Sequence, residues 1–212
     1  MMPKVLRGSA RVARVAPLRA VAALAVLATA CASTPAVAPA PAPRAGLTAA
    51  DLYPLDQGWK WAYDLEKDGQ SMLAMYAVLE RGTDIAIVQA GDDRLMYAIS
   101  AEGIAQKDGS VVGDFVVKNP IVAGTEWPVA GGRARIVAVA QSVTVTAGKF
   151  DDCVVVEATR ADPTRVVRTT FAPDIGPVII ELKIQVAGEL TTVTRATLRA
   201  LTKPGQDPLG GV

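Results

Sequence analysis

Histidine is absent from this chain of 212 residues, and its absence removes several classes of active site at once. Ser-His-Asp and Cys-His catalysis both need an imidazole, and so do the histidine-containing zinc sites. The usual proton shuttle near neutral pH is missing for the same reason. We therefore predict that the protein is not an enzyme and has no catalytic, metal-binding or cofactor-binding residue.

Other patterns that carry chemistry are missing as well. The sequence has no P-loop, no G-x-G-x-x-G, no G-x-S-x-G and no C-x-x-C, and it lacks the D-x-D-x-D-G spacing of calcium loops. Two pairs of adjacent acids are present, Asp92-Asp93 and Asp151-Asp152. Neighbouring side chains of a strand point to opposite faces, so neither pair forms a natural acid/base dyad. We interpret both pairs as solvated turn acids.

Cysteine is scarce, with only Cys31 and Cys153. Cys153 opens the apolar run Cys153–Val156, and the sequence shows no cationic neighbour that would activate its thiol. We therefore expect Cys153 to be a buried, unpaired side chain that packs as a small hydrophobic group rather than a reactive thiol.

Long hydrophobic runs are also missing. The apolar stretch Ala20–Ala30 is shorter than the roughly 20 residues that a membrane-spanning helix needs. It follows five basic residues without any acid and ends in small residues, which is the pattern of a removable secretory signal. We predict a signal peptide over residues 1–30.

The cysteine that follows this segment directly resembles the lipobox cysteine of bacterial lipoproteins. That resemblance implies acylation of Cys31, by palmitate-type chains, and a membrane anchor. Ala32, in place of Asp, implies sorting to the outer membrane, with the protein facing the periplasm or the surface. Ala28-Thr29-Ala30 also fits ordinary signal peptidase, so plain secretion is the alternative.

Removal of residues 1–30 changes the sign of the charge. The leader holds five of the 22 basic residues and no acid, which leaves 17 basic and 21 acidic residues and a net charge of −4. No cluster of Lys and Arg marks a nucleic-acid footprint, so we expect no nucleic-acid partner. The expected partners are the membrane, through the anchor, and either an apolar ligand or another envelope protein.

The rest of the chain predicts one domain between two loop-like segments. Residues 31–46 are rich in Pro and Ala and predict an extended spacer behind the anchor. Residues 47–204 are long enough to bury a core of their own. Residues 205–212 return to loop composition and predict a disordered tail.

The domain is expected to be all-β. Val178–Val186 alternates, with Val178, Ile180 and Leu182 on one face and Ile179, Glu181 and Lys183 on the other. Short apolar runs separated by turn residues recur along the domain and predict about ten strands in a single curled antiparallel sheet, barrel-like or sandwich. The only helical signal is the turn at Leu47–Leu52, where Thr48 predicts a cap and Asp51 follows three residues later. The other predicted strands are Trp59–Leu65, Met72–Leu79, Asp84–Gln89, Leu95–Ser100, Arg133–Ala140, Ser142–Thr146, Cys153–Thr159, Arg165–Phe171 and Leu190–Leu201.

One spacing occurs twice. Pro54-Leu55-x-x-Gly58-x-x-Trp61 is followed by Pro120-Ile121-x-x-Gly124-x-x-Trp127. In each, Pro ends the preceding segment, Gly permits a turn with positive φ, and Trp starts a strand that faces the core. The pair indicates either a structural repeat or a coincidence in a Gly- and Pro-rich sequence.

Together with two later segments, these motifs resemble a loosely defined group of exported bacterial β-proteins without an assigned activity. The resemblance implies turns and strand entries rather than chemistry. It rests on Y-P-L-x-x-G-x-x-W, A-G-x-F-x-x-C and A-P-x-I-G, with structural positions at Pro54, Gly58, Trp61, Gly124, Trp127, Gly148, Phe150, Cys153, Pro173 and Gly176.

Two functions follow for this domain. The first is a lipid-anchored envelope protein that acts as a non-enzymatic binding or structural module. The alternative is a periplasmic carrier of an apolar ligand or lipoprotein acyl chain, by analogy with carriers whose half-barrel wraps an apolar cavity. The residues that predict such a cavity are Met72, Leu73, Met75, Leu79 and Met96.

Overall fold

The computed structural model describes residues 44–161 and 164–206. The chain divides into two units, 1–38 and 39–212, and the fold below is that of the second. The predicted signal peptide, the acylated Cys31 and most of the spacer lie outside the described residues. In the described part of the chain, no helix has both the length and the apolar character needed to cross a membrane.

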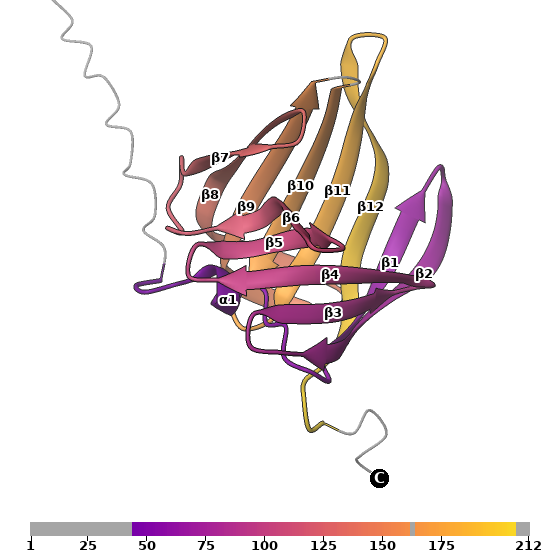
Figure 1. Cartoon of the computed structure of the whole chain (residues 1–212). Helices are drawn as coiled ribbons and strands as arrows, with labels where there is room; N and C mark the ends of the chain where they lie inside the picture. Colours follow the sequence, from indigo (N-terminus) through magenta and orange to yellow (C-terminus); the bar gives the residue numbers. More distant parts are fainter. Residues whose placement is uncertain (1–43, 162–163, 207–212) are drawn as a thin grey trace, which may run out of the picture. The chain divides into compact units, whose positions relative to one another are not determined.

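Twelve strands and one short helix make up the domain (Figure 1). The helix is α1 (Ala49–Leu52). The strands are β1 (Lys60–Lys67), β2 (Gln70–Arg81), β3 (Ile85–Ala90), β4 (Asp93–Ser100), β5 (Gly103–Asp108), β6 (Val111–Lys118), β7 (Glu126–Val129), β8 (Gly132–Val145), β9 (Gly148–Ala161), β10 (Thr164–Ala172), β11 (Gly176–Val186) and β12 (Glu189–Thr202).

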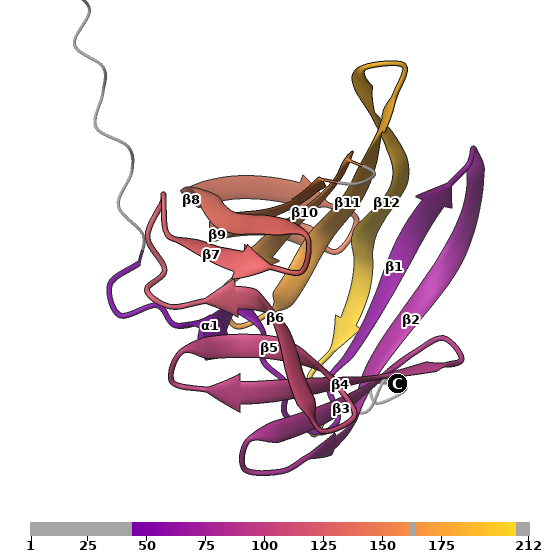
Figure 2. The ribbon, with the colours of Figure 1, turned by 45° about the horizontal axis from the view of Figure 1, so that its top comes forward.

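The strands form one antiparallel sheet that is nearly closed into a barrel. Each strand pairs with the next along the chain, except that β6 and β7 do not pair. The last strand, β12, pairs with the first, β1, so the ring is joined there and open between β6 and β7. Figure 2 shows β8–β12 curving round one side while β3–β6 cross the other.

The all-β, single-sheet prediction is confirmed in its barrel-like form, with twelve strands rather than about ten. The prediction missed β5, β6 and β7, and it divided β8 into two strands at Gln141. The division falls where β8 is bulged against β9, near Ala140, whose φ is 52°. The bulge interrupts the alternation of apolar and polar side chains by which a strand is recognised in a sequence.

The core lies on the inner face of the curled sheet. Trp61 and Tyr63, two residues apart on β1, are 1% and 2% exposed and share this face, as the period of a strand requires. Tyr53, just after α1, packs against Trp61, Tyr97 and Phe171 with ring centroids 5.4–6.1 Å apart. These rings come from β1, β4 and β10, so the aromatic cluster fills the inside of the barrel at the end next to α1. We call this end the base.

Helix α1 covers the base. Its predicted capping box is confirmed, with Thr48 and Asp51 bonded to each other through side chain and backbone. Leu52 is fully buried. Asn119, at the end of the first six strands, accepts a hydrogen bond from the Ala49 N–H at 2.9 Å. The opposite end, where the β1–β2 and β11–β12 turns lie and where β9 ends and β10 begins, is called the mouth.

Candidate functional site

Residues directly opposite each other in antiparallel strands project to the same side, so the ladders arrange the inner face in rows. A base row lies next to the aromatic cluster. A middle row, an open row and a rim row follow it towards the mouth. Their members are Val154, Phe171, Leu198, Tyr63 and Ala74 (base); Ile136, Val156, Thr169, Ile180, Ala196, Leu65 and Met72 (middle); Ala134, Ala158, Val167, Leu182, Thr194 and Lys67 (open); and Gly132, Arg160, Arg165, Ile184 and Thr191 (rim).

Burial falls from the base to the mouth. In the base row Val154 and Leu198 are 0% exposed. In the open row Leu182 is half-buried and Val167 is 37% exposed, and in the rim row both arginines are exposed. The core therefore fills only one end of the inner face, and apolar side chains continue beyond the point where packing stops.

A cavity of about 200 Å³ lies where the open row reaches the gap between β6 and β7. Its walls include Phe115, Val129, Val156 and Val167, with Arg160 at one side. The lining is mainly apolar and comes from both sides of the gap, which is the character expected of a small-molecule site.

Polar contacts join the two sides of this gap. The Trp127 indole N–H donates to the Phe115 carbonyl at 2.9 Å. Asp114 accepts from the Ala130 backbone N–H at 2.8 Å and from the Arg160 guanidinium at 2.9 Å. The gap is thus a seam that side chains close and that no backbone ladder spans.

The rim row carries the cations. Arg160 and Arg165 stand directly opposite each other across β9 and β10, both on the inner face. Neither arginine was predicted as a site residue. A signal was present, because the turn residues Asp162-Pro163 between two strands place Arg160 and Arg165 at matching positions of a hairpin.

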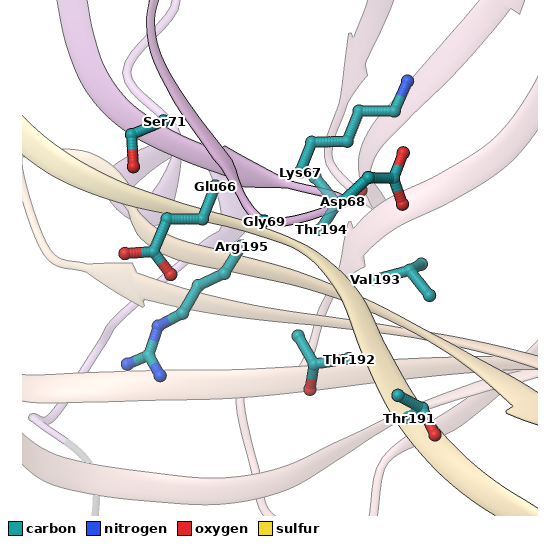
Figure 3. A pocket seen from close by; sticks show the side chains of 10 residues that line it. All are labelled: Glu66, Lys67, Asp68, Gly69, Ser71, Thr191, Thr192, Val193, Thr194 and Arg195. Atoms are coloured by element: carbon teal, nitrogen blue, oxygen red, sulfur yellow. The ribbon is translucent and has the colours of Figure 1, made fainter.

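A larger cleft of about 730 Å³ lies between the β1–β2 turn and β12 (Figure 3). It forms where β1 and β12 diverge, and its lining is polar: Glu66, Lys67, Ser71 and Arg195 contribute, with three threonines of β12. Figure 3 shows Glu66 and Arg195 on one side of the β12 ribbon and Lys67 on the other. Because these side chains do not converge, the seam cavity and open row are the better candidate site.

The predicted cavity residues need a correction. Of the five, only Met72 lies on the inner face, opposite Leu65. Leu73 and Met75 lie on the outer face and are 59% and 54% exposed, because the period of two sends neighbours of Met72 outward. Met96 lies next to the inward Tyr97, and Leu79 falls at a bulge of β2.

The two P-[L/I]-x-x-G-x-x-W segments share the geometry of their Gly turn and the burial of their Trp. Gly58 and Gly124 have φ of 98° and 92°. Each donates its N–H to a carbonyl of the second strand after it, Val78 of β2 and Ile136 of β8. Trp61 and Trp127 are 1% and 3% exposed. The indole N–H of Trp61 bonds the Ile175 carbonyl at 2.7 Å, as that of Trp127 bonds Phe115.

The remaining motif residues lie at turns and strand starts outside the open row. Gly176 begins β11, against the Trp61 ring, and Pro173 precedes it in the β10–β11 turn. Gly148 and Phe150 begin β9 in the β8–β9 hairpin, whose turn residue Ala147 bonds the Leu198 carbonyl at 3.1 Å. Pro54 lies between α1 and β1. None of them lines the seam cavity.

Cys153 is buried, as predicted, and has no disulfide partner among the described residues. Burial, with help from Asp151 and Asp152, raises the pKa of the Cys153 thiol to about 11. Asp151 forms an ion pair with Lys149 at 3.2 Å and a hydrogen bond with Ser142. Asp151 and Asp152 lie within β9 rather than in a turn. In the described residues no three acidic or Cys side chains cluster as a metal site would require.

Comparison with known proteins finds no matching family model and no matching curated protein. Two solved structures are similar in part. One, from Bacteroides fragilis, is provisionally described as an exported protein with a YmcC-like fold; identity is 14%, the TM-score is 0.47, and the match covers 72% of this chain and 99% of that one. The other, from Parabacteroides distasonis, is provisionally described as a lipoprotein; identity is 13%, the TM-score is 0.37, and coverage is 71% and 98%.

Proposed function

We propose that the mature protein is a lipid-anchored cell-envelope protein whose β domain binds an apolar ligand on its inner face, without catalysing a reaction. The observation that carries the proposal is the open row. There, apolar side chains of β9, β10 and β11 continue the core towards the mouth but are left half-covered.

Burial energetics support a ligand at this place. A packed core gains about 25 cal/mol for each Å² of apolar surface removed from water. Val167 and Met72, at 37% and 46% exposure, forgo part of that gain while facing the inside of the barrel. An apolar ligand along the open row and in the seam cavity would cover them.

The location rests on the leader. A basic segment, a short apolar core and Cys31 directly after it support export and acylation. We place the protein at the outer membrane, with its β domain held off the leaflet by the Pro/Ala spacer. This location supports a binding function, because a domain tethered beside a bilayer meets apolar molecules that leave or enter that bilayer.

The anchor is tested by growing cells with a fatty acid analogue and comparing the wild-type chain with Cys31→Ser. The wild-type chain should carry the label and fractionate with membranes, and the variant should lose both. Label retained in the variant contradicts the anchor.

Ligand binding is tested on the full chain carrying Cys31→Ser, so that no acyl anchor competes for the site. Native mass spectrometry should find an apolar molecule bound to this chain. Val167→Asp on the inner face should abolish the adduct. The matched control is Leu73→Asp, which places the same charge at an exposed apolar position of the outer face. A chain with no adduct and no uptake of added lipid would be a structural module, and the binding proposal would fail.

A further inference from the structure

We propose that Arg160 and Arg165 bind the carboxylate of a fatty acid whose single chain lies along the open row. This inference rests on the proposed function and names the class of ligand. Its starting point is the direct cross-strand pair that the two arginines form on the inner face.

Two like charges directly opposite each other in an antiparallel pair are unfavourable. On the outer face of the same strands an arginine faces acidic partners instead, because Arg168 stands opposite Glu157 and Glu181. On the inner face, Arg160 is held by Asp114 at 2.9 Å, and in the described residues Arg165 has no ion-pair partner. Among the described residues, two guanidinium groups and one carboxylate leave a net positive charge at the rim.

The positive rim adjoins the apolar surface on the same strands. Arg165 is two residues from Val167, so both side chains face inward on β10, and its neighbour across the ladder is Ile184. Arg160 and Val167 both line the seam cavity. A ligand that satisfies both features carries an anion at one end and an apolar body at the other.

The size of the cavity favours one chain. At about 200 Å³ it is smaller than the roughly 300 Å³ at which ligand pockets usually begin, so it suits the end of one acyl chain rather than a double-chain lipid. The guanidinium fork matches a carboxylate in two parallel hydrogen bonds, which favours a fatty acid head group at the arginine pair.

The test measures displacement of a fluorescent long-chain fatty acid from the full chain carrying Cys31→Ser. Competitors are a fatty acid, the alcohol of the same chain length and the corresponding lysophospholipid. The fatty acid should compete best. Arg165→Ala should weaken its binding by about fivefold, the upper end for an exposed ion pair, and bring it to the level of the alcohol. The matched control is Arg168→Ala, which removes an arginine from the outer face of the same strand.

The outcomes separate the two proposals. If neither acid nor alcohol displaces the probe and the probe itself does not bind, the proposed function fails. If acid and alcohol bind equally, or Arg168→Ala weakens the acid as much as Arg165→Ala, the apolar site stands and the arginine pair is not its anion site. Stronger competition by the lysophospholipid would also overturn the fatty acid assignment. Thermal unfolding of each variant checks that the fold is intact.

Discussion

Strands β1–β6 and strands β7–β12 contact each other at two places, and the two contacts differ. At the joint between β1 and β12, eight residue pairs form an antiparallel ladder with one bulge, between Ala62 and Tyr63. At the seam between β7 and β6, the links are the Trp127 indole, the Asp114 carboxylate and the Arg160 guanidinium. One ring of strands therefore contains a rigid joint and an opening beside the candidate site.

The sequence explains the difference at one position. Both β1 and β7 are entered through a Gly turn and have a buried Trp as their second residue, but Trp61 is followed by Ala62 and Trp127 by Pro128. Ala62 pairs with Ala200 of β12. Proline has no N–H to donate and is confined to edge strands, so β7 stays an edge and cannot continue the ladder. Pro128 of β7 therefore accounts for the opening, and the entry turn that β1 and β7 share does not.

Removal of the two tryptophans should have the largest effect on this comparison. Trp61→Ala and Trp127→Ala each delete a buried ring and an indole hydrogen bond, and each should lower the free energy of unfolding by about 3–5 kcal/mol. Trp61→Ala should cost more because its ring also packs on Trp59 and Tyr53. Urea unfolding measures both. A Trp127 variant as stable as the wild type would show that the seam contributes no packing.

The glycine at the start of β11 tests the joint side more finely. Gly176 has a φ of 107°, and an added Cβ would lie 3.2 Å from the Trp61 indole nitrogen. Gly176→Ala should cost about 2–4 kcal/mol, from backbone strain and from displacement of the ring. Gly148, with a φ of 136° and open space around it, is the matched control and should cost about 1–2 kcal/mol. Equal losses would mean that the contact with Trp61 is irrelevant.

The strands were not equally visible in the sequence. Strands β1–β4 and β10–β12 were predicted to within about two residues at each end, because short apolar runs rich in β-formers lie between clear turn residues. Strand β9 begins at Gly148, before the predicted start at Cys153. The missed strands β5, β6 and β7 contain Gly103, Gly113 and Pro128, which read as turn residues. Their neighbours in the sheet, rather than their own propensity, make them strands.

The candidate site shows the same limit. Alternation in Val178–Val186 correctly grouped Val178, Ile180 and Leu182 on one face. It could not show where the core stops along that face, since this depends on how far the sheet curls and on the aromatic cluster from β1, β4 and β10. The seam lies between β6 and β7, two strands that were not predicted from the sequence.

Helix α1 links the halves at the base without using either meeting point. Besides its bond to Asn119, the Asp51 carbonyl accepts from the Asp174 N–H at 2.7 Å. Hydrogen bonds from the Thr48 hydroxyl and backbone N–H lower the pKa of Asp51. The stabilisation from these hydrogen bonds is fully present above the pKa that Asp51 has in the unfolded state. It is lost as pH falls through the lower pKa that Asp51 has in the folded state. Thr48→Ala should therefore cost about 1 kcal/mol at pH 7 and less at acid pH, measured by urea unfolding at both.

The smallest expected effect is the sharpest test of the two meeting points. Asp114 ties Arg160 across the seam, and Asp64 ties Arg199 at the joint at 2.7 Å; both ion pairs are partly exposed. Asp114→Asn and Asp64→Asn should each change the free energy of unfolding by less than about 1 kcal/mol.

Hydrogen exchange should nevertheless distinguish the two variants. Amides of β6 and β7 should exchange faster in Asp114→Asn because no ladder protects them, whereas those of β1 should be unchanged in Asp64→Asn. High salt should make the wild-type seam resemble the Asp114 variant, since it screens the same pair. Equal exchange at both places would mean that the seam is as firmly joined as the ladder, and a ligand could then enter only through the mouth.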